Sequence, residues 1–188
     1  MPGRFQITEY CHHFLEEYVR ENDCCIDATA GNGNDTEFLC RMVGEGGKVY
    51  AFDVQEEAIR QTRLRLENAG LTARASLILD GHENMAKYVQ EEASAVVFNF
   101  GYLPGGDHKV ATRPETSLIA VEQGLGLLKK GGVMSLCIYS GGDTGYEEKD
   151  ALLSYLKELD SKKWLVLVNS YYNRKNDPPL PVFVIRLK

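Results

Sequence analysis

The sequence predicts an α/β protein in which a mostly parallel, doubly wound sheet carries helices on both of its faces. Two observations predict this class. Apolar runs typical of strands alternate along the chain with stretches in which apolar residues recur at helical spacing. Polar and glycine residues gather where the predicted strands end, which is where such sheets bind ligands. Because the chain has 188 residues, we expect a single domain, residues 1–188, around one core.

The first half of the chain alternates short strands with helices. An amphipathic helix is expected to begin near Thr8, whose hydroxyl can cap it. The elements expected next are the strand CCID (24–27), a helix that includes residues 38–43 and ends at GEGG (44–47), the strand KVYAFD (48–53), a helix over 55–70, the strand ASLILD (75–80), a helix over 83–92 and the strand AVVFNF (95–100). Gly70 suits the end of its helix because glycine readily adopts the left-handed backbone.

The second half continues the alternation and then changes. A helix over 114–130 begins at Pro114, which suits the first helical position. The elements after it are the strand GGVMSLCIY (131–139), a helix over 147–160 and the strands WLVLVNSYYN (164–173) and PVFVIRLK (181–188). The last two strands are too close in sequence for a helical crossover, so they should pair antiparallel. We therefore predict seven strands with an antiparallel pair at the C-terminal end.

Composition excludes several classes of protein. The chain is 44% hydrophobic and 26% charged, which is typical of ordinary globular proteins and argues against disorder. No apolar run approaches the roughly 20 residues of a membrane span, and the N-terminus does not resemble a secretory signal, so we expect a cytoplasmic protein without a membrane partner. The net charge of −6 argues against a broad nucleic-acid-binding face, but a compact basic patch at Lys129-Lys130, Lys162-Lys163 or Arg174-Lys175 stays possible.

The five cysteines do not follow a metal-binding or redox pattern. None forms a C-x-x-C pair or lies near a histidine at zinc-finger spacing. We expect them to be buried as small apolar residues, and we expect no metal site. They are Cys11, Cys24, Cys25, Cys40 and Cys137.

The loop in DATAGNGNDTEFL (27–39) is the first candidate binding element. Glycine lets a backbone approach a ligand closely. The nicotinamide fingerprint requires a third glycine, where this chain has Thr36. A carboxylate at Asp27 would repel a pyrophosphate but would accept hydrogen bonds from an ammonium group. The loop therefore favours S-adenosylmethionine, and the cofactor-binding residues predicted from it are Asp27, Ala28, Gly31, Asn32, Gly33, Asn34, Asp35 and Thr36.

Acidic residues end the next two predicted strands as well. Asp53 suits the ribose hydroxyls of the cofactor, with Gln55 beside it. Asp80 ends the third strand, where Gly81 and His82 are expected to border the adenine. Each residue also has a structural interpretation: Asp27 as a turn cap, Asp53 as a helix cap and His82 as a solvated loop residue.

Three segments together resemble a known family. D-A-T-A-G-N-G-N-D-T (27–36), A-F-D-V-Q (51–55) and N-F-G-Y-L-P-G-G-D (99–107) resemble the small bacterial class I methyltransferases of the "putative rRNA methylase" family, and the resemblance covers nearly the whole chain. That family includes the enzyme that methylates the amine of 5-aminomethyl-2-thiouridine at the tRNA wobble position. The resemblance implies a Rossmann-like class I methyltransferase fold, S-adenosylmethionine as cofactor and tRNA, at its anticodon region, as partner.

Asn99 and Tyr102 are the predicted catalytic pair. N-F-G-Y looks like a variant of the N-P-P-Y motif of amino-group methyltransferases. The asparagine carbonyl can accept a hydrogen bond from the acceptor amine and aim its lone pair, while Asn99 also borders the cofactor. The tyrosine ring can stack on the base. The structural interpretation is a strand-end turn residue and a packed loop anchor.

Other residues are expected on the acceptor side. Asp107 is the third predicted catalytic residue; it or His108 would take the amine proton, although water can take it as well. The remaining predicted substrate-binding residues are Gly105, Gly106, His108, Thr112 and Tyr139. Thr112 would hold a phosphate or cap the next helix. His12 and His13 either touch substrate or pack, and Trp164 and Tyr171-Tyr172 are expected to pack the last strands.

The leading hypothesis is conversion of 5-aminomethyl-2-thiouridine to 5-methylaminomethyl-2-thiouridine in tRNA. Alternatives that keep the methyl donor are an rRNA acceptor or a small-molecule amine or hydroxyl. A nicotinamide-dependent oxidoreductase and a non-catalytic nucleotide-binding module are further alternatives. Because the chain is short, RNA must be bound by the catalytic face or by a homodimer.

Overall fold

A computed structural model of the chain describes residues 6–100, 113–139, 145–175 and 177–188. Its strands are β1 (Cys24–Asp27), β2 (Lys48–Asp53), β3 (Ala75–Leu79), β4 (Ala93–Phe100), β5 (Leu128–Ile138), β6 (Trp164–Val168) and β7 (Leu180–Arg186). Its α-helices are α1 (Ile7–Leu15), α2 (Asn34–Val43), α3 (Glu56–Ala69), α4 (Pro114–Leu127) and α5 (Gly145–Lys157), with short 3-10 helices η2 (Thr72–Arg74) and η3 (His82–Lys87).

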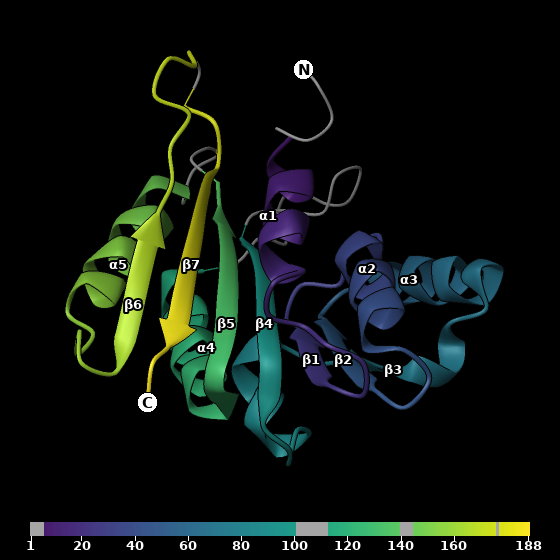
Figure 1. The fold of residues 1–188 in the computed structure, drawn as a ribbon. Helices are drawn as coiled ribbons and strands as arrows, with labels where there is room; N and C mark the ends of the chain where they lie inside the picture. Colours follow the sequence, from purple (N-terminus) through teal and green to yellow (C-terminus); the bar gives the residue numbers. More distant parts are fainter. Residues whose placement is uncertain (1–5, 101–112, 140–144, 176) are drawn as a thin grey trace.

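The strands form one seven-stranded sheet in the order β3-β2-β1-β4-β5-β7-β6 (Figure 1). The pairs among β1 to β5 are parallel, whereas β7 pairs antiparallel with both β5 and β6. The predicted seven strands and the antiparallel C-terminal pair are confirmed. The sequence did not show that β7 lies between β5 and β6.

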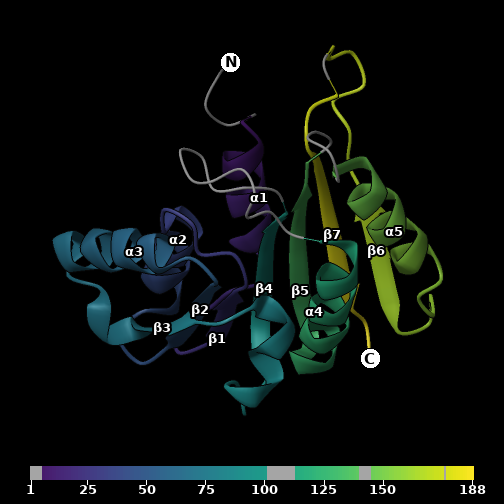
Figure 2. The same cartoon turned by 180° about the vertical axis from the view of Figure 1, so that it is seen from behind.

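Helices cover both faces of the sheet. Helices α1 and α2 lie in front of it in Figure 1, and α4 and α5 lie in front in the reverse view of Figure 2. The pleat divides the buried strand residues between the two layers: Val96, Phe98 and Phe100 belong to one core cluster, while Ala95 and Val97 belong to the other. The continuous apolar run of β4 therefore has an apolar layer on each side, as expected for a central parallel strand.

Several element boundaries differ from the prediction. Helix α1 has Gln6 as its N-cap without a side-chain capping bond, so Thr8 lies inside the helix rather than at its start. The segment predicted as a helix over 83–92 contains only η3, because the chain must reach β4 within a few residues. Strand β6 ends at Val168, and Tyr172 is 99% exposed. The prediction that Tyr172 packs the last strands was therefore wrong, whereas Trp164 is buried.

The five cysteines are all buried free thiols, as predicted. Burial raises the pKa of Cys25 to about 12, so this thiol stays protonated at neutral pH. Within the described residues, no group of three or more His, Cys, Asp or Glu side chains is arranged to hold a metal ion. None of the helices in the described part of the chain is long and apolar enough to cross a membrane.

Candidate cofactor and acceptor site

The carboxyl ends of the parallel strands bring the candidate residues to one edge of the sheet. Strand β1 lies between β2 and β4, with Asp27 in register with Ala51 and Val97. The polar residues that follow these strands therefore lie side by side, although they are far apart in the sequence.

Asp27, at the end of β1, is completely buried. The Thr36 hydroxyl donates a hydrogen bond of 2.5 Å to one carboxylate oxygen, and the Thr29 amide donates one of 3.1 Å to the other. The carboxylate thus ties the glycine loop to the first turn of α2, which matches its interpretation as a turn cap. Its expected contact with the ammonium group of a cofactor stays a prediction.

The environment of Asp27 disfavours its charge. Burial, followed by the negative charge of Asp35 and less strongly by that of Asp53, raises the pKa of Asp27 from 3.8 to about 7, against the lowering effect of the Thr36 and Thr29 hydrogen bonds. Three carboxylates therefore interact at this edge of the sheet. A positively charged ligand would relieve their repulsion, whereas a pyrophosphate would increase it.

The glycine loop is held from outside by α3. Arg65 donates a hydrogen bond of 2.8 Å to the Asn32 carbonyl, and the Thr62 hydroxyl donates one of 3.1 Å to the Gly31 carbonyl. Gly33 has φ +77°, and a Cβ there would lie 2.9 Å from the Cα of Thr62. Gly33 is therefore required for close packing of the loop against α3, a reason that the sequence pattern did not show.

Asp53 fastens the same loop from the end of β2. One carboxylate oxygen accepts a hydrogen bond of 2.9 Å from the Gly31 amide, and the other accepts one of 2.9 Å from the Gln55 amide. Because an ionised carboxylate offers about four acceptor positions, Asp53 keeps capacity for two further donors such as ribose hydroxyls. The hydrogen bond to Gln55, which is the N-cap residue of α3, also fits the interpretation of Asp53 as a helix cap.

Asp35 connects three elements near the end of β4. Its Oδ2 accepts a hydrogen bond from the side-chain amide of Asn99, and its Oδ1 lies 2.5 Å from Nε2 of His12. The His12 ring stacks on Phe38 with centroids 3.9 Å apart. The Asn99 backbone amide also donates a hydrogen bond of 2.7 Å to the Thr29 hydroxyl. Asn99 is thus fixed through both its backbone and its side chain.

The remaining loop residues are placed as follows. Ala28 and Gly33 are buried, Thr36 is completely buried, and Asn34 is exposed at the start of α2. Gly33 is the N-cap of α2 and provides no side-chain capping bond, although Asp35 and Glu37 place negative charge in the first turn. The hydroxyl of Thr36 donates its hydrogen to Asp27, so its predicted cofactor contact would use the hydroxyl oxygen as an acceptor.

His82, which follows β3, is less exposed than its interpretation as a solvated loop residue implies. His82 is 8% exposed and meets the rings of Phe98 and Phe100 edge-on, at 5.9 and 6.2 Å. Burial lowers the pKa of His82. Asp80 accepts hydrogen bonds from the Gly81 amide at 2.7 Å and from the Tyr88 hydroxyl at 2.7 Å. Gly81 and His82 therefore form a rigid corner, and their contact with adenine stays a prediction.

The predicted acceptor residues are only partly described. Tyr139 follows β5 at the same edge of the sheet and is 44% exposed. The other predicted residues of this group lie outside the described residues: Tyr102, Gly105, Gly106, Asp107, His108 and Thr112.

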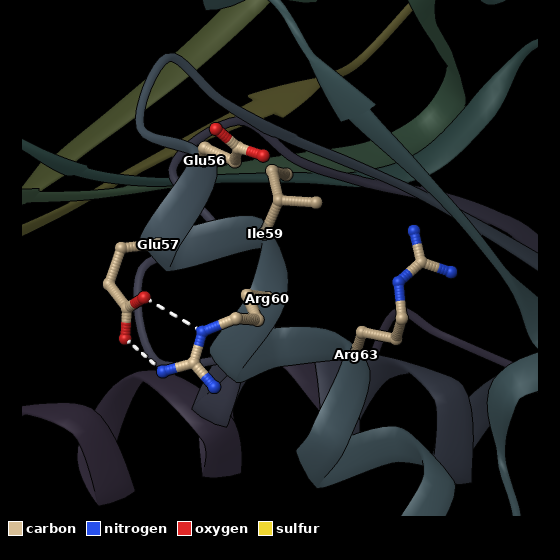
Figure 3. A pocket seen from close by; sticks show the side chains of 5 residues that line it. All are labelled: Glu56, Glu57, Ile59, Arg60 and Arg63. Carbon is tan, nitrogen blue, oxygen red and sulfur yellow. Dashed lines mark hydrogen bonds and ion pairs between the residues drawn. The ribbon is translucent and has the colours of Figure 1, made fainter.

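Two surface hollows differ in their relation to this site. The first, of about 530 Å³, is lined by Glu56, Glu57, Ile59, Arg60 and Arg63, all on α3 (Figure 3). The Arg60 guanidinium is paired with Glu57 at 2.6 Å. One helix alone cannot enclose a ligand, so we assign no function to this hollow. The second, of about 500 Å³, lies where α1 begins and includes Tyr139.

Solved structures of similar chains share this fold. The structure of a "putative rRNA-methylase" from Clostridium thermocellum is 45% identical and has a TM-score of 0.94, covering 96% of this chain and 97% of that one. A "putative methyltransferase" from Streptococcus mutans, solved in complex with SAH, is 42% identical with a TM-score of 0.89, covering 97% and 98%. The fold is the Rossmann-like class I methyltransferase fold, and the chain is an S-adenosylmethionine-dependent methyltransferase.

The family follows from the sequence comparison. Residues 49–185 match the family described as "Putative rRNA methylase", and the chain belongs to it. A relative from Arabidopsis thaliana, named tRNA (mnm(5)s(2)U34)-methyltransferase, chloroplastic, is 37% identical over 196 residues, covering 99% of this chain and 70% of the relative.

Proposed function

We propose that this protein transfers a methyl group to the side-chain amine of 5-aminomethyl-2-thiouridine at the wobble position of tRNA, giving 5-methylaminomethyl-2-thiouridine. The name of the relative from Arabidopsis thaliana, which covers 99% of this chain, supports a tRNA wobble acceptor. The observation that supports the proposal most strongly is the hydrogen bond from the Asn99 side-chain amide to Asp35. Because the amide nitrogen is bound there, the carbonyl oxygen is the group of Asn99 that is left to contact an acceptor.

The three carboxylates suit the proposed cofactor. Burial and, after it, the negative charges of Asp35 and Asp53 raise the pKa of Asp27, and a ligand that carries positive charge would suit this group of carboxylates. Asp53 would hold the ribose hydroxyls with its remaining acceptor capacity. When bound, S-adenosylmethionine supplies a methyl group already activated by a sulfonium. The protein therefore has to orient the acceptor and exclude water rather than activate the donor.

Asn99 is suited to orient an amine. Its amide nitrogen donates a hydrogen bond to Asp35, and none of the described residues donates a hydrogen bond to its carbonyl oxygen. An oxygen in that position accepts a hydrogen bond from an amine N–H and turns the nitrogen lone pair toward the donor. Asp35 is held in turn by His12, so the orientation does not depend on one flexible contact.

The predicted roles of Tyr102 as a stacking residue and of Asp107 as proton acceptor complete this proposal. A wobble base is single-stranded and enters a pocket without the opening of a duplex. The cytoplasmic location and a homodimer remain predictions.

The acceptor is tested with labelled donor. The protein is incubated with labelled S-adenosylmethionine and, in separate reactions, with tRNA lacking the terminal methyl group, with rRNA and with small primary amines. Each RNA is then digested to nucleosides. We expect label in the wobble nucleoside of tRNA, and the Asn99→Ala variant should transfer none. Label in rRNA alone would support the acceptor named in the family description, and label in small amines alone would exclude an RNA acceptor.

A further inference from the structure

We propose that the connection between β6 and β7 contacts the single-stranded RNA beside the target nucleotide, through the ring of Tyr172 and the cations Arg174 and Lys175. This inference rests on the proposed function, because it assumes an RNA acceptor. It assigns a binding surface to residues outside the cofactor and acceptor site.

The connection lies at the edge of the sheet that carries the site. Strand β6 runs parallel to β5, so its carboxyl end and the following residues lie beside the carboxyl end of β5, where Tyr139 lies. In Figures 1 and 2 the connection extends beyond the sheet on the same side as the start of α1. The Tyr10 hydroxyl of α1 donates a hydrogen bond of 3.2 Å to Asn169, which joins the two segments.

A hollow of about 500 Å³ separates the start of α1 from the connection. It is lined by Gln6, Ile7, Thr8, Tyr139, Tyr171, Arg174, Lys175 and Pro178. This set contains two cations, two tyrosines and no carboxylate. The Tyr171 hydroxyl is buried and has no partner within the described residues, so Tyr171 offers ring surface rather than a polar group. The hollow combines positive charge with aromatic surface in a protein whose net charge is −6.

Tyr172 is the most unusual side chain of this surface. It is 99% exposed, although a tyrosine ring is large and mostly apolar. The amide of Arg174 donates a hydrogen bond of 2.9 Å to the Tyr171 carbonyl, so the backbone around Tyr172 is held in a turn. A ring presented in this way suits stacking on an unpaired base.

The surface carries two cations, because Arg174 and Lys175 are both exposed. Asp177, the nearest carboxylate in the sequence, lies 3.3 Å from Lys149. Exposed Arg and Lys next to an exposed aromatic ring are the combination that binds single-stranded nucleic acid. RNA fits the surface better than a second copy of this chain, because RNA offers both a phosphate for each cation and an unpaired base for the ring.

The test compares binding of a fluorescent anticodon stem-loop to the full chain and to four variants over a range of salt concentrations. Arg174→Ala/Lys175→Ala removes two cations at the surface. Lys130→Ala/Lys162→Ala removes two exposed cations near the amino ends of β5 and β6, at the opposite end of these strands from the surface, and serves as the matched control. Tyr172→Ala removes the aromatic ring, whereas Tyr172→Phe keeps the ring and removes only the hydroxyl.

We expect the Arg174/Lys175 double variant to bind roughly 10-fold more weakly near physiological salt, with a salt slope smaller by about 1.4, since each phosphate contact on a single strand contributes about 0.7. Tyr172→Ala should weaken binding roughly 5- to 150-fold at every salt concentration, and Tyr172→Phe should bind normally. The control double variant should bind as the unmodified protein does. S-adenosylmethionine affinity should be unchanged in all variants, and the KM for RNA should rise while kcat at saturation is kept.

The outcomes separate the two proposals. If the unmodified protein binds no RNA, the proposed function is overturned. If it binds RNA and the surface variants bind equally well, the surface is overturned and the proposed function stands. If the surface variants convert a dimer to a monomer with RNA binding unchanged, the surface is a contact between copies and this inference is overturned.

Discussion

The side-chain amide of Asn99 donates a hydrogen bond to Asp35, a residue 64 positions earlier in the chain. The contact joins the end of β4 to the first turn of α2, and His12 of α1 holds the other oxygen of Asp35. A carboxylate that binds both an amide nitrogen and an imidazole determines the orientation of the amide. The carbonyl of Asn99 is therefore directed before any acceptor arrives.

We predict that Asn99→Ala lowers kcat about 100-fold or more while leaving the Kd for S-adenosylmethionine within about threefold, because orientation of the acceptor is lost and the carboxylates that suit the donor stay in place. Single-turnover kinetics and calorimetric titration of the donor measure the two effects. If donor affinity falls together with turnover, Asn99 binds the donor instead of orienting the acceptor.

His12 and His13 are neighbours on α1 with different contacts, which makes them a matched pair. His12→Ala removes the contact with Asp35 and the stacking on Phe38, whereas His13 lies exposed beside Glu16 at 3.3 Å. We expect His12→Ala to lower the free energy of unfolding by about 1–3 kcal/mol and His13→Ala to change it by about 0.5 kcal/mol or less.

The His12 variant should also turn over more slowly, by roughly 10-fold at saturating substrates, because Asp35 loses one of the groups that hold it. Thermal unfolding and kcat are measured on both variants. Equal effects of the two substitutions would show that the His12–Asp35 contact does not support Asn99.

Asp27 should make the stability of the fold depend on pH. The unfolded chain releases this proton near 3.8 and the folded chain releases it near 7, so the folded state holds the extra proton between these values. The stabilising contribution of this proton is complete below about pH 3.8 and is lost as the pH rises toward 7. Asp27→Asn removes the titrating group and keeps an oxygen that accepts a hydrogen bond.

We therefore compare the free energy of unfolding of Asp27→Asn with that of the unmodified protein. The value for the variant minus the value for the unmodified protein should increase by about 1–3 kcal/mol when the pH is raised from about 5 to about 8. Urea unfolding of both proteins at the two pH values gives this difference, and the effects of titrating groups that do not interact with Asp27 cancel in it. A difference that is independent of pH would mean that Asp27 is charged in the fold near neutral pH.

Alanine substitutions at Gly33 and Gly70 distinguish the cost of backbone strain from the cost of a steric clash. Both have positive φ, +77° and +69°, but a Cβ at Gly33 would lie 2.9 Å from the backbone of Thr62, whereas nothing lies within 4 Å at Gly70. Gly70→Ala should cost about 1–2 kcal/mol of unfolding free energy, which is the strain alone. Gly33→Ala should cost at least about 1 kcal/mol more and should weaken S-adenosylmethionine binding, since the loop moves away from α3. Equal costs in denaturant unfolding would argue against close packing at Gly33.

Much of the fold could be predicted because its signals are local. The strands CCID and KVYAFD have the observed bounds of β1 and β2, and Gly70 ends α3 in the left-handed conformation. Apolar runs and a helix-terminating glycine act over a few residues, so one sequence suffices to find them. The shortness of η3 depends on where the chain must go next, and the sequence of this segment does not show that.

The candidate site was predictable in position but not in its contacts. Strand ends showed that Asp27, Asp53 and Asn99 would share one edge of the sheet. The link from His12 to Asp35 spans 23 residues and joins two helices, so no spacing rule could find it. The hydrogen bond from Thr36 to Asp27 also depends on how α2 packs against the end of β1, and the spacing of the two residues did not show it.

The most direct test of the proposed chemistry is the position of the transferred methyl group within the product nucleoside. After reaction with tRNA that carries 5-aminomethyl-2-thiouridine, the digested wobble nucleoside is fragmented and its methyl group is located by mass spectrometry. We predict a single methyl group on the side-chain nitrogen that Asn99 orients. A methyl group on a ribose oxygen or a ring atom would contradict amine orientation by Asn99.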